Sequence, residues 1–152
     1  AAGGIADGRG LASVLLSGAD GVMMGTRFWA SKEAKGSSIA KNKLIHADGD
    51  NTVRSNIFDM ARGYNWPPAF TGRVLENEFS SRWKSEIGEF NQDLEAKIAE
   101  YQNSEEDDYS IRALIAGEAV DLIKSVDSAE KIIGDTVEEA AQILLEAPKL
   151  LV

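Results

Sequence analysis

Cysteine is absent from the 152-residue sequence, and histidine occurs only once. The chain can therefore form no disulfide, no thiolate nucleophile and no cysteine-based metal site, and we predict no metal centre. Basic residues are also scarce, since 16 lysines and arginines stand against 25 acidic residues and leave a net charge of −9. A nucleic-acid surface would need a basic patch, so we expect no nucleic-acid partner.

Long apolar runs are missing as well. The longest fall far short of the roughly 20 residues that a membrane-spanning helix needs, so we expect no membrane insertion. Apolar residues make up 43% of the sequence and charged residues 27%, which is typical of an ordinary soluble globular protein. The expected location is cytoplasmic.

Glycine, in contrast, is concentrated where two predicted strands end. Residues 1–4 and 21–24 are apolar or small and predict strands, and each strand leads into a glycine-containing loop. Residues 9–17 have the apolar spacing of an amphipathic helix, which Gly18 would end. Such a β–α–β unit suits a phosphate held by backbone N–H groups. The candidate binding residues in the two loops are Gly3, Gly4, Met23, Met24, Gly25 and Thr26.

Two motifs carry a family resemblance: GGIADG at residues 3–8 and GADGVMMGTRF at residues 18–28. They resemble the last two βα units of FMN-dependent (β/α)8 barrels, in which the loops after strands seven and eight commonly hold a phosphate. The family that the sequence resembles most is the nitronate monooxygenases, also called 2-nitropropane dioxygenases. The flavin-dependent enoyl-acyl-carrier-protein reductases share both motifs. A further motif at residues 66–83, W-P-x-x-F-x-G-R-x-L-x-N-x-F-x-x-R-W, favours the nitronate monooxygenases.

The resemblance implies an α/β fold, with the last two βα units of a TIM barrel followed by a mostly helical region. Residues 1–48 would belong to the FMN-binding barrel, residues 49–109 to a family-specific loop and long helix, and residues 110–152 to helices that pack on the body. A complete barrel needs about 250 residues. We therefore expect this chain to be the C-terminal part of a longer protein, inactive alone, with its catalytic residues upstream.

The implied chemistry is the oxidation of an alkyl nitronate by O2 with bound FMN. The backbone N–H groups of Gly4, Gly25 and Thr26, with the Thr26 hydroxyl, are expected to hold the phosphate. Gly3 would serve the turn, and Met23 stands where many relatives have glutamine, so only a backbone contact is expected there. A homodimer is compatible with the resemblance. The alternatives are an NAD(P)H-dependent enoyl reductase and a non-catalytic relative that keeps only the phosphate site.

Five other features admit both a functional and a structural interpretation. Arg27 could contact the phosphate or be an exposed residue after a strand. His46 could be catalytic, but a helix C-terminal residue that interacts with the helix dipole is favoured. The acidic loop at residues 102–108 favours a solvent-exposed linker over a metal site. Gly117 either resembles a glycine of the family that lies near the flavin or allows close packing of a helix. The aromatic side chains of the loop at residues 64–70 either pack this loop against the rest of the protein or line a substrate site.

The remaining pattern predicts five elements, of which the first is the last helix of the barrel segment or a piece of it. Helices are inferred from apolar residues at three- and four-residue steps, and the strand from alternation. The predicted elements are a helix at residues 38–46, a strand at residues 52–60, a long helix at residues 80–101, a short helix capped by Asp127 and Ser128 that ends at Gly134, and a last helix from Thr136 to Pro148.

Overall fold

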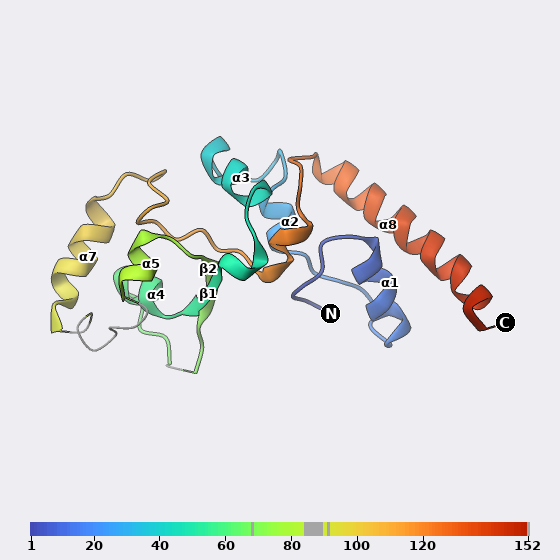
Figure 1. Cartoon of the computed structure of the whole chain (residues 1–152), viewed down its shortest axis with the longest axis horizontal. Helices are drawn as coiled ribbons and strands as arrows, with labels where there is room; N and C mark the ends of the chain where they lie inside the picture. Colours follow the sequence, from blue (N-terminus) through green and yellow to red (C-terminus); the bar gives the residue numbers. More distant parts are fainter. Residues whose placement is uncertain (68, 84–89, 91, 152) are drawn as a thin grey trace. The chain divides into compact units, whose positions relative to one another are not determined.

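The computed structural model describes residues 1–67, 69–83, 90 and 92–151. Their contacts divide the chain into two compact units, of which the first combines residues 1–49 with residues 117–152 and the second contains residues 50–116. Figure 1 shows the elements of both units. The three-part division at residues 48 and 109 stays a prediction.

The first unit is built mainly from helices. Its longest helix, α8 (Ala129–Glu146), packs along α1 (Gly8–Leu16), and Figure 1 shows the two side by side. The elements are α1 (Gly8–Leu16), α2 (Thr26–Trp29), α3 (Ser38–Ile45), the 3-10 helix η2 (Glu118–Leu122), α8 (Ala129–Glu146) and the 3-10 helix η3 (Ala147–Leu151), while a further 3-10 turn, η1 (Gly49–Asn51), begins at the last residue of the first segment.

The predicted helix between the two glycine loops is present as α1. The Asp7 side chain caps its start by accepting a hydrogen bond of 3.1 Å from the backbone N–H of Gly10. Gly18 ends it, with a φ of 95° and an N–H that donates to the carbonyl of Leu15 at 3.0 Å. The end at Gly18 is therefore the one that the sequence predicts, whereas the cap by Asp7 is an addition from the structure.

The sequence predicts two helices in the C-terminal segment, but the structure has one continuous helix, α8. Ser128 caps it as expected, because its hydroxyl accepts from the N–H of Lys131 at 3.2 Å. The helix then continues without a break through Gly134 and Thr136 to Glu146. A glycine inside a helix costs only about 1 kcal/mol relative to alanine. Packing against α1 outweighs that cost, and the residues buried on this face are Ile132, Thr136 and Ala140.

The second unit contains a two-stranded sheet and short helices. Strands β1 (Thr52–Ser55) and β2 (Gly72–Leu75) are antiparallel, with Thr52 opposite Leu75 and Ser55 opposite Gly72. The helices are α4 (Ile57–Ala61), α5 (Glu78–Trp83) and α7 (Leu94–Asn103).

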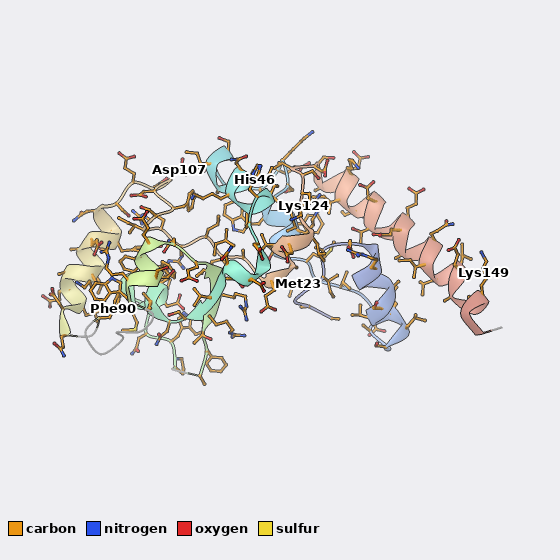
Figure 2. The ribbon with its side chains drawn as sticks, viewed as in Figure 1. Met23, His46, Phe90, Asp107, Lys124 and Lys149 are labelled. Atoms are coloured by element: carbon orange, nitrogen blue, oxygen red, sulfur yellow. The ribbon has the colours of Figure 1, made fainter. Side chains whose placement is uncertain are left out.

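An aromatic cluster forms the core of the second unit. Phe79 is fully buried, and its ring centroid lies 5.7 Å from that of Phe58 and 6.0 Å from those of Phe90 and Tyr101. Phe90, labelled in Figure 2, is also fully buried. The tilted and edge-on ring arrangements are those that aromatic quadrupoles favour. Phe90 and Tyr101, which lie within the helix predicted over residues 80–101, belong to this core, and Trp83 and Leu94 pack against it.

Two predicted elements of this unit differ from the structure. The strand expected over residues 52–60 ends at Ser55, because Ile57, Phe58 and Ala61 bury one face of α4. The single helix expected over residues 80–101 is interrupted before α7, since Asp93 has non-helical dihedral angles (φ −135°, ψ 47°). Residues 84–89 and 91 of that prediction lie outside the described residues.

The aromatic loop is not pinned down by its aromatic side chains. Tyr64, Trp66 and Phe70 are all more than half exposed. Pro68 in the same loop lies outside the described residues. Tyr64 and Trp66 instead line an open cavity of about 410 Å³ together with Met60.

Among the described residues, no helix has both the length and the apolar character needed to cross a membrane.

Candidate functional site

The two glycine loops begin side by side. A parallel bridge joins Ala2 to Met23, and the N–H of Met23 donates to the carbonyl of Ala1 at 2.9 Å. The strands predicted at residues 1–4 and 21–24 are thus reduced to this single bridge. Because the two segments run in the same direction, the loops that follow them leave from the same edge, as the β–α–β prediction requires.

The first loop has a backbone that only glycine adopts readily. Gly3 and Gly4 have φ values of 86° and 74°, both in the left-handed region, and both residues are exposed. Within the described part of the chain, the N–H of Gly4 meets no acceptor. The loop therefore presents a backbone donor to its surroundings.

The second loop passes through Met23 and Met24 into Gly25, which precedes α2. The Met23 side chain, labelled in Figure 2, is 71% exposed, and Met24 is half-buried. The N–H groups of Gly25 and Thr26 meet no acceptor among the residues that the structure describes. A Cβ atom added at Gly25 would contact nothing within 4 Å. Open space therefore lies where a bound group could approach this backbone.

Thr26 makes a contact that links the second loop to a distant segment. Its Oγ1 accepts a hydrogen bond of 2.9 Å from the N–H of Gly117, the residue that precedes η2. A Cβ at Gly117 would lie 3.5 Å from this oxygen, an ordinary contact distance. Since Oγ1 acts here as an acceptor, the hydroxyl hydrogen of Thr26 is still available for donation. Gly117, singled out in the sequence, thus lies directly beside a predicted site residue.

The structure contradicts one of the two interpretations of Arg27, that of an exposed residue after a strand. Its side chain is only 10% exposed, so it is not a solvent-facing residue. The guanidinium donates to the carbonyl of Ser125 at 3.1 Å and to the carboxylate of Asp127 at 2.9 Å. The sequence does not reveal this pair, because Asp127 followed by Ser128 predicts only a helix cap. A buried arginine normally requires a carboxylate partner, but the sequence does not indicate which one.

The pKa of Asp127 is held below its ordinary value. The hydrogen bond from the Ser125 hydroxyl is the main cause, burial opposes it, and the positive charges of Lys131 and Arg27 add to the lowering. A carboxylate with a lowered pKa stabilises the folded state at pH values above its unfolded pKa, and this contribution is lost as the pH falls through the folded pKa.

We expect Asp127→Asn to lower the free energy of unfolding at neutral pH by about 1 kcal/mol, a modest value because the pair keeps some contact with water. The difference should shrink as the pH falls from about 3.9, the ordinary aspartate value, through the lower pKa of Asp127 in the folded protein, because the wild-type carboxylate becomes neutral over this range. Urea unfolding of the whole protein at neutral and acidic pH measures it. A difference that stays constant over this range would show that the charge of Asp127 does not matter.

The other candidates have structural positions. His46, labelled in Figure 2, is the C-cap of α3, and its Nδ1 lies 2.9 Å from the carbonyl of Asn42. This is the helix-end position that the sequence analysis favoured. The acidic loop predicted at residues 102–108 begins only after α7, which extends to Asn103. The loop is mostly exposed, and Asp108 accepts hydrogen bonds from the N–H and hydroxyl of Ser110. Within the described residues, no group of acidic or histidine side chains could hold a metal ion.

Solved structures share this fold. The chain superimposes on FabK from Thermotoga maritima with a TM-score of 0.80 and 28% identity, covering 98% of this chain and 46% of that one. A nitroalkane oxidase from Streptomyces ansochromogenes gives a TM-score of 0.68 at 23% identity, covering 99% of this chain and 40% of that one, which shows similarity of fold alone. The partial barrel predicted from the sequence, the last two βα units, is not directly shown by the described residues.

Curated relatives cover the chain almost completely. The nitronate monooxygenase npaC of Metarhizium robertsii is 40% identical over 151 residues, which are 95% of this chain and 42% of that protein. A nitronate monooxygenase of Neurospora crassa is 33% identical over 145 residues, or 93% of this chain and 37% of that protein. The chain therefore spans less than half the length of the relatives it matches.

Fold and relatives together define the chain as part of an oxidoreductase family of flavin enzymes. The family model for nitronate monooxygenase matches residues 1–139. The chain belongs to the nitronate monooxygenase family. The resemblance identified from the glycine motifs, including its relation to the enoyl-acyl-carrier-protein reductases, is confirmed.

Proposed function

We propose that this chain supplies the loops that bind the FMN phosphate in an enzyme that oxidises alkyl nitronates with O2. The observation that carries the proposal is the set of unused backbone donors at one edge of the first unit. They are the N–H groups of Gly4, Gly25 and Thr26, which meet no acceptor within the described residues. Catalytic residues outside this chain, a homodimer and a cytoplasmic location, all expected from the sequence, belong to the same proposal.

The residues present fit a phosphate. Backbone N–H groups at the start of a short helix are suitable donors for an anion, and TIM barrels commonly place such a helix after the last strand. Thr26 can donate its hydroxyl hydrogen as well, because Oγ1 is already held by Gly117. Gly3 shapes the first turn. The backbone contact expected from the sequence at Met23 is not available, because the N–H of Met23 already donates to the carbonyl of Ala1. Met24 would contribute through its backbone N–H.

The start of α1 is less suitable for the phosphate. Two carboxylates already satisfy it, since Asp7 accepts from Gly10 and Glu139 accepts from Gly8 at 2.7 Å. The phosphate would therefore lie toward the start of α2, with the first loop contributing Gly4. Of the helix starts that follow the two loops, we therefore propose only that of α2 as a phosphate site.

The role of these residues is to bind and orient. FMN, when bound, supplies the ring system that accepts electrons from the nitronate and passes them to O2. The loops hold the phosphate, which does not react, and this binding energy fixes the position of the reacting ring. We propose no proton transfer by a residue of this chain, and the groups that do so are expected in the remainder of the protein.

An enoyl reductase that uses NAD(P)H is the second candidate, and the superposition on FabK favours it. The motif at residues 66–83 and the two curated nitronate monooxygenases favour the first. A non-catalytic relative would keep the phosphate site but turn over neither substrate.

Anaerobic mixing of the flavin-loaded whole protein distinguishes these candidates. We expect an alkyl nitronate to change the flavin absorbance rapidly and NADPH to leave it nearly unchanged. The opposite pattern would assign the protein to the reductases. A flavin that responds to neither compound would favour the non-catalytic relative.

A further inference from the structure

We infer that α8, with the residue just before its cap, fixes the position of the two phosphate-binding loops relative to each other. None of these residues belongs to either loop. The inference rests on the proposed function. Two contacts carry it, one between Glu139 and Gly8 at the start of α1, and one between Asp127, just before α8, and Arg27 in α2. Glu139 and Asp127 are thereby assigned as positioning residues for the cofactor.

The first contact fixes the helix that follows the first loop. The N–H of Gly8 donates to Oε2 of Glu139 at 2.7 Å, across a sequence separation of 131 residues. A Cβ at Gly8 would come within 2.7 Å of the carbonyl of Thr136 and 2.6 Å of the backbone nitrogen of Ala140. The backbone of α1 therefore lies directly on the backbone of α8, and no side chain at Gly8 separates them.

The second contact fixes the short helix that follows the second loop. Arg27 is adjacent to Thr26, and its guanidinium binds the Asp127 carboxylate at 2.9 Å. The backbone of Asp127 contributes as well, because its carbonyl accepts from the N–H of Lys32 at 2.8 Å and it forms a parallel bridge with Ser31. Asp127 thus binds α2 through its side chain and the following segment through its main chain.

A single continuous helix joins these contacts. Helix α8 runs from Ala129 to Glu146, so about 15 Å of rigid helix separates Ala129, two residues after Asp127, from Glu139. The bridge between Ala2 and Met23 sets the spacing between the two loops where they begin. The contact with Glu139 of α8 and the contact with Asp127, just before α8, set this spacing where the loops end, at the helices that follow them. A phosphate bound by donors from both loops requires both spacings to be correct.

The surroundings of the two contacts allow them to be tested without damage to the core. Glu139 is exposed, and Arg27, Asp127 and Glu139 line the same polar cavity of about 280 Å³. Removal of the Glu139 side chain therefore opens no void in packed apolar surroundings. The large destabilisation that follows truncation of a core residue is not expected here.

The test compares FMN with riboflavin, which has the same ring but no phosphate. In the whole protein, we expect Glu139→Ala to weaken FMN binding about tenfold, the equivalent of one hydrogen bond to a charged group. Riboflavin affinity should stay unchanged. Glu139→Gln should retain most of the FMN affinity, because the amide oxygen also accepts from Gly8. Glu139→Ala combined with Asp127→Ala should weaken FMN binding further. Flavin fluorescence titration measures all these affinities.

Glu138→Ala is the matched control, since it removes the same charge from an exposed neighbouring position on α8 and should leave both affinities unchanged. FMN affinity equal to wild type in the combined variant would overturn the inference. Equal losses for FMN and riboflavin would overturn it too, since they would indicate general destabilisation. A wild-type protein that binds riboflavin as tightly as FMN would instead contradict the proposed phosphate site.

Discussion

Gly25→Val in the whole protein is expected to abolish FMN retention, with a loss of affinity of at least about 100-fold, the equivalent of roughly 3 kcal/mol. The valine side chain would occupy the open space beside the N–H groups of Gly25 and Thr26. Gly25 has ordinary helical dihedral angles, and a Cβ there meets no protein atom within 4 Å. The fold itself should therefore tolerate the substitution, and the loss should be confined to the ligand. The flavin content of the purified protein, read from its absorbance, is the measurement.

Gly134→Val is a suitable control for this variant. Gly134 also has no atom within 4 Å of an added Cβ, but it lies on the exposed side of α8, away from both loops. It should retain flavin at the wild-type level. Retention of stoichiometric FMN by Gly25→Val would show that no phosphate lies beside this backbone, and the assignment of the second loop would fail.

Phe79→Ala is expected to cause the largest loss of stability in the second unit, about 3–5 kcal/mol. Phe79 is fully buried and contacts three other aromatic rings, so its removal leaves a cavity and also removes favourable ring–ring contacts. Urea unfolding of the whole protein should show a lower midpoint for the transition of this unit.

Phe70→Ala provides the comparison, because the same side chain is removed from a position that is 63% exposed. Its effect should be within about 0.5 kcal/mol. Similar losses for the two variants would contradict the assignment of Phe79 to the core. A loss at Phe70 alone would indicate that another part of the whole protein covers the aromatic loop.

Features determined by neighbouring residues were predictable from the sequence. Asp7 and Gly18 mark the two ends of α1, and Ser128 marks the start of α8, because capping depends on residues within one turn of the helix end. The proximity of the glycine loops follows from the β–α–β order, which the bridge between Ala2 and Met23 confirms. The roles of the six loop residues in phosphate binding stay predictions.

Features that depend on distant contacts were not predictable. Arg27 and Asp127 are separated by 100 residues, and Gly8 and Glu139 by 131. A single sequence contains no signal that joins such positions. The same reason explains why the break predicted at Gly134 was wrong, since the contact of α8 with α1 outweighs the local preference of one glycine.

Oxygen uptake by the flavin-loaded whole protein, given an alkyl nitronate and no pyridine nucleotide, tests the central claim most directly. We predict rapid uptake that depends on the nitronate and that is lost in Gly25→Val. Absence of uptake from a protein that holds stoichiometric FMN, together with reduction of the flavin by NADPH, would contradict the account and assign the chain to a reductase.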